Sequence, residues 1–145
     1  MSDLSIPIRL CPQAQPPEYA HDGDAGADLR IREPVTLAPG ERALVGTGVA
    51  AAIPPGYVGL VHPRSGLAHR HGLSIVNAPG VIDSGYRGEI MLNLINLDRR
   101  HAVTLEPGER VAQLLVQRVE IATFAVVEEL ETSERRDRGH GSTGR

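Results

Sequence analysis

Acidic, basic and hydroxyl side chains that could do chemistry gather in three glycine-rich segments of the chain. The first segment, residues 22–30, alternates aspartate with glycine and includes Asp28. Aspartate oxygens are suitable ligands for a divalent cation, but this segment lacks the spacing and the terminal glutamate of a calcium-binding loop. Taken alone, the segment favours a turn with acidic side chains on the surface, and a metal-binding role is the alternative.

The second segment, residues 62–68, places Arg64, Ser65 and Gly66 in succession. A guanidinium, a hydroxyl and a glycine N–H form a compact anion-binding group if the peptide turns at that point. The adjacent His69 and His71 stand two residues apart with no third ligand nearby in the sequence. We therefore expect these histidines to be solvated surface residues and not metal ligands.

The third segment, residues 77–89, contains a Pro-Gly pair, an acid, a Ser-Gly pair and an aromatic side chain. This order predicts a hairpin that carries Asp83 at its mouth. Because Asp83 follows an apolar Val-Ile pair, we expect it to be partly desolvated, which suits a carboxylate to act as a general base. An aspartate that only stabilises a turn is the alternative that this segment leaves open.

Composition restricts the functions that these segments can serve. The chain has 145 residues, enough for one domain with its own core. All 15 basic residues are arginines, so the chain lacks the lysine of a Walker A phosphate-binding loop or of a Schiff base. The net charge of −3 argues against a broad nucleic-acid-binding surface, although arginines can still gather at phosphate groups. The residue types suit a phosphorylated ligand and a divalent metal, with no nucleic-acid partner.

Targeting and membrane signals are missing from the sequence. The first ten residues lack the basic start and apolar run of a signal peptide, and the lone Cys11 suits a reducing compartment. Residues 43–61 are uncharged over a length that could span a bilayer, but they contain a Pro-Pro-Gly turn and further glycines. We expect two buried strands around that turn, in a cytoplasmic protein with no membrane partner.

Short apolar segments rich in β-branched residues, separated by turn signals, predict an all-β fold. Residues 90–95 alternate, with Ile90, Leu92 and Leu94 on the apolar face. The run VTLAPGER at residues 35–42 recurs as VTLEPGER at residues 103–110, each with Pro-Gly at a position typical of a type II turn. Two such strand–turn–strand units predict a distorted jelly-roll-like β-barrel or sandwich. The predicted strands are Leu4–Leu10, Arg42–Ile53, Tyr57–His62, Leu73–Val76, Glu89–Leu97, His101–Leu105 and Arg110–Val119.

The end of the chain has a different character. Residues 128–145 are almost without apolar side chains and rich in charge and glycine, so they cannot bury enough surface to offset the entropy lost on ordering. We expect a β-rich domain over residues 1–127 and a flexible, glycine- and arginine-rich C-terminal arm over residues 128–145. A frayed tail is the simpler interpretation of this composition. However, the Gly-His-Gly-Ser-Thr-Gly ending contains the N–H groups and hydroxyls of an anion-wrapping loop.

In chain order, these segments resemble the five motifs of the trimeric dUTP pyrophosphatases, or dUTPases. The resemblance runs from Ile6 to the C-terminus, and five motifs in order at fitting spacings are far more specific than any one motif alone. The matching segments are Ala25–Leu29, Pro63–Ala68, Gly80–Gly88, Gly108–Leu114 and Arg135–Gly144.

The resemblance implies an enzyme that hydrolyses dUTP to dUMP and pyrophosphate, with water attacking the α-phosphorus in line. Such an activity limits uracil incorporation into DNA and supplies dUMP for thymidylate synthesis. By motif, Asp83 corresponds to the catalytic base that orients and deprotonates the water. Asp28 would help to hold the Mg²⁺ cofactor through its water shell, with the metal itself on the three phosphates.

The remaining motif positions imply contacts with each part of the nucleotide. Asn77 and the hairpin backbone up to Met91 would read the uracil edge, and Tyr86 would lie against the deoxyribose, where a 2′-hydroxyl has no room. The family is a homotrimer whose active sites are shared between subunits, which implies the same assembly for this chain. The residues implied in phosphate binding are Arg64, Ser65, Gly66 and Gln113.

The fifth motif departs from the family pattern of Arg-Gly-X-Gly-Gly-aromatic-Gly. Residues 135–141 run Arg-Arg-Asp-Arg-Gly-His-Gly, so arginine replaces two glycines and His140 stands at the aromatic position. The resemblance implies that this arm closes over bound nucleotide, with Arg135 or Arg136 on the γ-phosphate and His140 stacked on the uracil. Gly141 and Ser142 are the other arm residues expected to contact substrate.

Two other functions are compatible with the same fold. A dCTP deaminase has a catalytic glutamate where this chain has Asn93, and an amide cannot shuttle the proton that deamination requires. That enzyme also has Arg-Ser-Ser where residues 64–66 are Arg-Ser-Gly. A non-catalytic nucleotide-binding protein is expected to lack the acids, yet Asp28 and Asp83 are both present.

Overall fold

The computed structural model describes residues 4–133, and strands dominate that part of the chain. The elements are β1 (Ile8–Leu10), β2 (Ala27–Arg30), β3 (Val35–Leu37), β4 (Arg42–Ala51), β5 (Tyr57–Pro63), α1 (Ser65–His71), β6 (Leu73–Ile75), β7 (Gly80–Ile82), β8 (Glu89–Asn96), β9 (Val103–Leu105) and β10 (Arg110–Arg118). The predicted all-β fold is confirmed. Among the described residues, the structure contains no helix of the length and hydrophobicity needed to cross a membrane.

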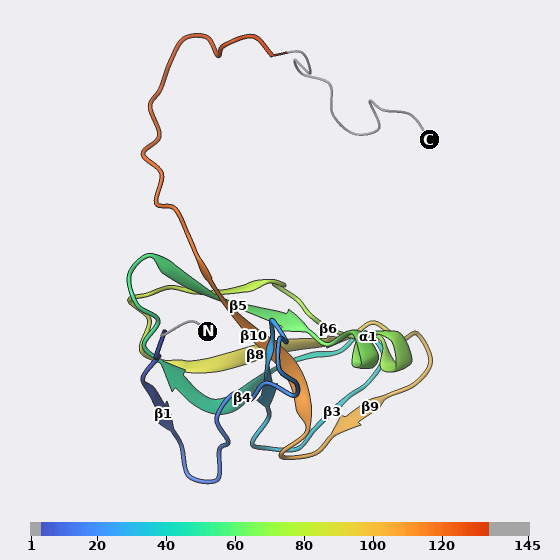
Figure 1. Ribbon diagram of the computed structural model, residues 1–145. Coiled ribbons are helices and arrows are strands. Elements are labelled where there is room, and N and C mark those ends of the chain that lie inside the picture. The colour runs from blue at the N-terminus through green and yellow to red at the C-terminus, as the bar shows by residue number, and fades with distance from the viewer. Residues whose placement is uncertain (1–3, 134–145) are drawn as a thin grey trace.

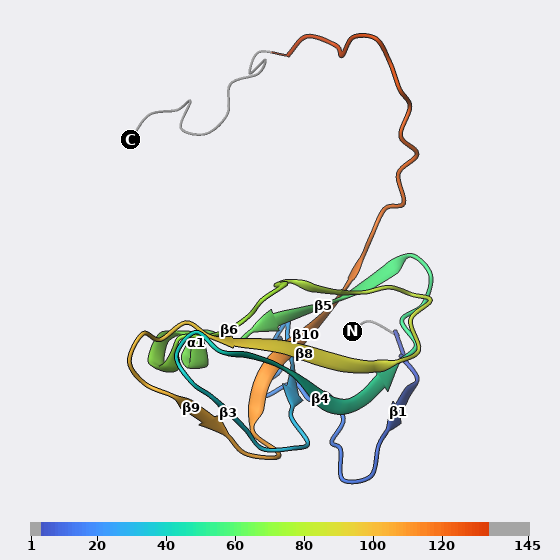
Figure 2. The same cartoon turned by 180° about the vertical axis from the view of Figure 1, so that it is seen from behind.

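Two four-stranded sheets form the body of the protein, and every strand pair in them is antiparallel (Figures 1 and 2). One sheet has the order β1-β4-β8-β6 and the other the order β2-β10-β5-β7, while β3 and β9 form a separate pair. From β4 to β8 the chain alternates between the two large sheets, as jelly-roll connections do. The sheets stay distinct and do not close into one barrel.

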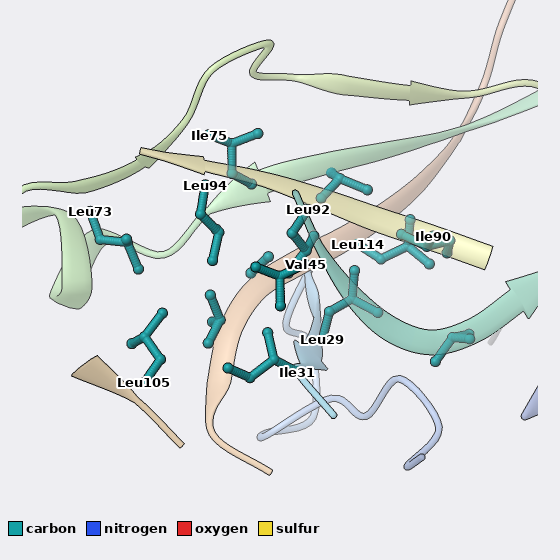
Figure 3. Close-up of a cluster of buried hydrophobic side chains, with 14 of the residues drawn as sticks. Leu29, Ile31, Val45, Leu73, Ile75, Ile90, Leu92, Leu94, Leu105 and Leu114 are labelled. Atoms are coloured by element: carbon teal, nitrogen blue, oxygen red, sulfur yellow. The ribbon is translucent and has the colours of Figure 1, made fainter. Parts of the chain in front are cut away.

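The hydrophobic core is built from the inward faces of both large sheets (Figure 3). The alternation predicted for residues 90–95 is confirmed, because Ile90, Leu92 and Leu94 on β8 are fully buried. The other sheet contributes side chains such as Leu29 on β2 and Leu114 on β10. Each fully buried leucine or isoleucine contributes about 1.5–3 kcal/mol relative to an exposed one, so this core is the main source of stability.

The two copies of the VTL-x-PGER repeat pair with each other. In β3 and β9, Val35 lies opposite Leu105 and Val103 opposite Leu37. Each copy then enters a tight turn in which Gly40 and Gly108 have φ angles of 77° and 85°, a region that glycine adopts without strain. The predicted Pro-Gly turns are therefore confirmed. The β3–β9 pair contributes Leu37, Val103 and Leu105 to the hydrophobic core.

Four elements lie outside the strand ranges predicted from the sequence, namely β2, β3, β7 and α1, although the repeat already indicated a strand at the position of β3. The β2 and β7 strands have 4 and 3 residues, too short for alternation to stand out. The helix α1 occupies the anion-binding segment and ends at Gly72, whose left-handed φ of 63° is a common helix C-cap. Of the four, β2, β7 and α1 carry or adjoin candidate site residues, so short elements position much of the candidate site.

The chain leaves the body after β10. Residues 119–133 form no strand or helix and lead away from the sheets (Figures 1 and 2). The Val119 N–H still donates to the Gly56 carbonyl, with an N···O distance of 3.0 Å. Beyond it, the apolar side chains of Ile121, Phe124 and Val126 are almost fully exposed. The packed body thus ends before residue 127, and the boundary placed there stays a prediction.

Candidate active site

A charged hollow of about 600 Å³ collects the candidate residues of the first, second and fourth motifs. The sheet order β2-β10-β5 explains why these distant segments meet: Gln113 on β10 lies opposite Asp28 on β2 and opposite His62 on β5. The candidate residues that line this hollow are Asp28, Arg64, Ser65, Gly66 and Gln113. We call it the charged hollow.

Asp28 is the electrostatic centre of the charged hollow. Its side chain is only 9% exposed, and the two carboxylate oxygens each contact a different arginine. Oδ1 lies 2.9 Å from Nε of Arg64, and Oδ2 lies 3.4 Å from Nη1 of Arg110. Arg64 also donates from Nη1 to the Arg110 carbonyl at 3.0 Å. The acid therefore holds Arg64 in one orientation, because a guanidinium bound on two sides has few rotamers left.

The amide of Gln113 is fixed at the floor of the charged hollow. Its Nε2 donates to the Pro63 carbonyl at 3.0 Å. The side chain passes directly over Gly26, where an added Cβ would overlap with Oε1 of Gln113. Only glycine is compatible with this approach, which explains why the first motif has a glycine two residues before its aspartate.

Helix α1 supplies part of the wall of the charged hollow, through Ser65, Gly66 and Arg70. It starts at Ser65 and Gly66, and its preceding residue Arg64 provides no side-chain cap. The first N–H groups of a helix have no partner within the helix, so they face outward. The guanidinium of Arg70 lies over Gly66, with Nη2 3.2 Å from the position of an added Cβ. Arg70 therefore adds a third guanidinium to a wall with two backbone donors.

The loop after β8 packs behind α1. The Leu97 N–H donates to the Gly72 carbonyl at 2.9 Å, which joins this loop to the end of the helix. Within the loop, Asp98 accepts hydrogen bonds from the N–H groups of Arg100 and His101. These backbone hydrogen bonds lower the pKa of Asp98 below its ordinary value of 3.8, and the nearby His101 acts in the same direction.

A second hollow, of about 200 Å³, lies where β5, β6, β7, β8 and the loop of residues 83–88 meet. We call it the hairpin hollow, after the hairpin predicted for residues 77–89. Its apolar walls include Val61 and Ile75, and the candidate residues that line it are Asn77, Asp83, Tyr86 and Met91. The predicted hairpin is wrong, because β7 pairs with β5 whereas β8 pairs with β4 and β6. Residues 83–88 instead form a loop that connects the two large sheets, with Asp83 directly after β7. Most of the lining residues are apolar, so the shape of this hollow can be specific for a flat ring.

The ring of Tyr86 is held at the hairpin hollow by contacts within the loop between β7 and β8. Its hydroxyl Oη donates to the Glu89 carbonyl at 2.8 Å, and its N–H donates to the Asp83 carbonyl at 3.0 Å. The ring lies over Gly88, where an added Cβ would come within 2.5 Å of Oη. Glycine at residue 88 is therefore needed for the ring to adopt this position.

Asp83 itself is exposed in the single chain. The expectation that its apolar neighbours desolvate it is wrong for the chain alone, because Val81 is 60% exposed and points away from the core. An alternating strand turns successive side chains to opposite faces, so an apolar pair cannot both cover the next residue. Any desolvation of this carboxylate has to come from a ligand or from another chain.

Within one chain the two hollows are separate. Ile82 lies opposite Gly59 near the start of β5, whereas Arg64 follows the end of the same strand at Pro63. Four residues of extended strand separate Gly59 from Pro63, a span of about 13 Å, and none of residues 4–133 lines both hollows. The structure thus groups the candidate residues in two sets, and it does not bring Asp83 next to its own Arg64.

The donor groups of the charged hollow are compatible with a metal ion that is coordinated mainly by a bound phosphate ligand and only indirectly by the protein. Within the described part of the chain, the structure contains no group of three or more histidine, cysteine or acidic side chains placed to bind a metal ion. Both oxygens of Asp28 already contact arginines, so this carboxylate can reach a cation best through water. A Mg²⁺ ion bound to substrate phosphates, with Asp28 in its outer shell, is compatible with these residues.

The structure adds three residues to the sequence-derived set. Arg110 and Arg70 line the charged hollow, and Glu89 lines the hairpin hollow. Arg110 stands inside the fourth motif, three residues before Gln113, so its motif was the available signal. No sequence motif indicates that Arg70 or Glu89 lines either hollow. Four candidate residues of the arm, Arg135, His140, Gly141 and Ser142, lie outside the described residues.

Comparison with known proteins follows the same motifs. The pattern that defines the dUTPase family matches residues 13–144. Proteins named deoxyuridine 5′-triphosphate nucleotidohydrolase are similar over nearly the whole chain. The protein from Cutibacterium acnes is 59% identical, covering 99% of this chain and 94% of its own. The protein from Mycobacterium tuberculosis is 57% identical, covering 99% of this chain and 97% of its own.

Solved structures show the same likeness in three dimensions. The dUTPase of Staphylococcus bacteriophage 80alpha, determined with dUpNHpp, has a TM-score of 0.89 and 34% identity, and covers 97% of this chain and 98% of its own. A mutant of the dUTPase from phage phi11 of S. aureus, described for the coordination of a structural Mg(II) ion, has a TM-score of 0.81 and 31% identity, covering 89% of this chain and 100% of its own. The chain therefore belongs to the dUTPase family.

Proposed function

We propose that this protein hydrolyses dUTP to dUMP and pyrophosphate, with water attacking the α-phosphorus in line. The observation that carries the proposal is the pair of hollows with complementary chemistry. One presents Arg64, Arg70 and Arg110 around a buried acid, and the other presents a ring-sized cavity with an exposed carboxylate at its mouth. A nucleoside triphosphate has the matching parts, a flat base and sugar followed by a chain of charged phosphates.

The charged hollow is proposed to bind the triphosphate. Arg64, Ser65 and Gly66 supply a guanidinium, a hydroxyl and a backbone N–H on adjacent residues, and Gln113 supplies an amide. Phosphoryl transfer depends on placement and charge neutralisation more than on covalent catalysis. The ion pairs around Asp28 prepare this placement, because they fix the guanidinium before the substrate arrives.

The hairpin hollow is proposed to bind deoxyuridine. The side chain of Asn77 and the backbone up to Met91 can pair with the uracil edge. The narrow hollow would then leave no room for the 5-methyl group of thymine. The ring of Tyr86, held by its bond to the Glu89 carbonyl, would lie against the sugar and exclude a 2′-hydroxyl. Selection is then mainly steric, since a rigid wall rejects added atoms more strongly than a flexible one.

Asp83 is proposed as the general base. It stands at the mouth of the hairpin hollow, on the side from which water can reach a bound nucleotide. A positioned base contributes about 10²–10⁴-fold to the rate, so arginines and metal must supply most of the remaining stabilisation. Mg²⁺ on the phosphates, with Asp28 in its outer shell, would neutralise charge on the phosphate chain when bound. The chain's own residues would then orient the nucleotide and take the proton.

A homotrimer with shared sites is proposed because one chain cannot complete the site. A base has to lie within hydrogen-bond reach of the attacking water, yet Asp83 and Arg64 belong to separate hollows of one chain. The hairpin hollow of one copy facing the charged hollow of another removes this conflict. The exposed apolar side chains of residues 121–127 support association too, since large exposed apolar surfaces are typical of interfaces.

The arm is proposed to close over the bound nucleotide. Residues 119–133 already lead away from the body, which is compatible with a segment that reaches another copy (Figure 1). Arg135 or Arg136 would then contact the γ-phosphate, and His140, Gly141 and Ser142 would cover the base and phosphates. Deleting Thr132 to Arg145 is expected to abolish turnover while the melting temperature and the mass of the assembly stay nearly unchanged. A truncated protein with full activity would show that the arm is only a tail.

This proposal implies a cytoplasmic enzyme that limits uracil incorporation into DNA and supplies dUMP for thymidylate synthesis.

The decisive experiment incubates the purified protein with each dNTP and Mg²⁺ and measures pyrophosphate and ammonia. We expect pyrophosphate from dUTP alone and no ammonia. Ammonia from dCTP would favour the deaminase alternative, for which Asn93 on β8 is unsuited. Binding of dUTP without any product would favour a non-catalytic protein.

A further inference from the structure

One carboxylate, that of Glu89 at the start of β8, joins the end of the loop after β7 to a bulge in β4. Its Oε1 accepts a hydrogen bond from the Gly48 N–H at 2.7 Å and another from Nε of Arg32 at 3.2 Å. Its side chain is only 25% exposed. The two partners precede Glu89 by more than forty residues, so this contact links separate parts of the fold.

The bulge in β4 leaves a place that this carboxylate fills. The register between β4 and β8 shifts between Gly46 and Ala50, so the ladder does not supply a partner for the Gly48 N–H. Gly48 has a φ of 74°, and an added Cβ at Gly46 would overlap with Oε1 of Glu89. Gly46 thus makes room for the carboxylate, whereas an added Cβ at Gly48 would meet Ala14. The Thr47 hydroxyl adds a bond to the Ile90 carbonyl at 2.8 Å.

The backbone of the same residue holds Tyr86. The Glu89 carbonyl accepts the bond from Oη of Tyr86 at 2.8 Å. The tyrosine remains 43% exposed, so packing alone does not determine its position. The location of the ring therefore depends on the location of the Glu89 carbonyl. Both the ladder, in which Glu89 lies opposite Ala50, and the bond from its carboxylate to the bulge hold this residue.

We propose that Glu89 is a positioning residue that sets the sugar selectivity of the hairpin hollow, through the chain of contacts from Arg32 and Gly48 to the Tyr86 ring. Losing its charge lets the start of β8 move, and the Tyr86 ring moves with it. The proposal rests on the proposed function, in which Tyr86 excludes the 2′-hydroxyl of a ribonucleotide. Displacements of about 1 Å at a site can change rates by about 10²-fold, so smaller movements are measurable.

The test compares E89Q with E33Q, a matched control. Arg32 also contacts Glu33, with Nη1 3.8 Å from Oε1, and the Glu33 side chain is 72% exposed and outside both hollows. Each variant removes one carboxylate partner of Arg32, but only E89Q alters the link to β8. We expect E89Q to reduce the ratio of kcat/KM for dUTP to kcat/KM for UTP by about 10-fold, and E33Q by less than about 2-fold.

Two further variants keep the result decisive. R32M removes the charged partner from the other side and is expected to lower the same ratio, so it replaces E89Q if that variant does not fold. Y86F removes the hydroxyl bond to the Glu89 carbonyl. If both residues act through one contact, the double variant E89Q/Y86F changes the ratio by less than the product of the two single effects.

The outcomes separate this inference from the proposed function. If E89Q and R32M lower activity on dUTP and UTP equally, or lower only the melting temperature, Glu89 has a structural role alone and the inference is overturned. If Y86A changes the ratio while E89Q and R32M do not, the inference is also overturned, but the role of Tyr86 stands. If Y86A leaves the ratio unchanged as well, the proposed role of Tyr86 in sugar selection is the part that is wrong.

Discussion

The two hollows of this protein are built in opposite ways. The charged hollow is formed by residues from β2, β10, α1 and the loop before β2, and ion pairs between Asp28, Arg64 and Arg110 hold it in place. The hairpin hollow is formed by residues from β5 to β8 and the loop after β7, and hydrogen bonds to backbone carbonyls hold its aromatic wall. Charge organises the first hollow, whereas backbone geometry organises the second.

This difference corresponds to the two parts of a nucleotide. A phosphate chain is flexible and strongly charged, so it is bound best by prepared guanidinium groups. A base and sugar are rigid and nearly neutral, so they are selected best by a wall that cannot move. Changes in the charged hollow should therefore affect KM and salt dependence, while changes in the hairpin hollow should affect turnover and selectivity.

The largest effect is expected at Asp83, the one candidate with a chemical role. Asp83→Asn keeps the shape of the side chain but removes its ability to accept a proton, so kcat for dUTP should fall by about 10²-fold or more. Binding should persist, because the phosphate contacts lie in the other hollow. Steady-state kinetics and calorimetry with dUTP measure the two quantities. A D83N protein with near-normal turnover would show that the base is elsewhere.

A smaller effect is expected at Asp28. Asp28→Asn removes the charge between Arg64 and Arg110, and it should raise KM for dUTP about 10-fold. Both arginines are partly exposed, so water can replace their lost hydrogen-bond partner. The free energy of unfolding should therefore fall by an amount near the lower end of the ~1–3 kcal/mol expected when a buried partner is removed. Asp24→Asn is the matched control, since Asp24 lines the same hollow but bonds to the His21 N–H instead of an arginine. Equal effects in the two variants would contradict the proposed orienting role.

The same contrast explains how much of the site could be predicted from the sequence. Most of the hairpin hollow comes from residues 77–91, so the turn signals and the acid of this segment predict a turn with Asp83 beside it. The predicted pairing of its two strands is wrong, because β7 and β8 belong to different sheets. The strand alternation around Ile90 and the Pro-Gly turns of the repeat were likewise predictable, because local patterns determine them.

The charged hollow could not be assembled from the sequence in the same way. Its ion pair between Asp28 and Arg110 joins residues 82 positions apart, and only the strand order β2-β10-β5 brings them together. The link from Glu89 to Gly48 depends on a register shift in β4, and no residue pattern reveals such a shift. Long-range pairing is what a single sequence leaves undetermined.

Selectivity should respond to Tyr86 more than overall activity does. Tyr86→Ala opens the space that a 2′-hydroxyl needs, so the preference for dUTP over UTP should narrow by about 10-fold. Tyr19→Ala is a suitable control, since Tyr19 is exposed and lines neither hollow. Competition assays with both nucleotides measure the preference directly. If discrimination is unchanged in Y86A, another residue excludes ribose.

The smallest effect is expected at Asp98, behind the wall of the charged hollow. Hydrogen bonds from the Arg100 and His101 N–H groups lower the pKa of Asp98 in the folded protein. The charged Asp98 side chain therefore stabilises the fold at pH values above its ordinary pKa of 3.8, and this stabilisation is lost as the pH falls through the lowered pKa. Asp98→Asn keeps an acceptor oxygen but has no charge to titrate. At pH 7 the variant should melt slightly below the wild type, and the difference should shrink below about pH 4. Thermal melts of both proteins from pH 3 to pH 7 test this, and a pH-independent difference would contradict it. Activity on dUTP should stay unchanged at pH 7, because the loop contacts α1 at its far end, at Gly72.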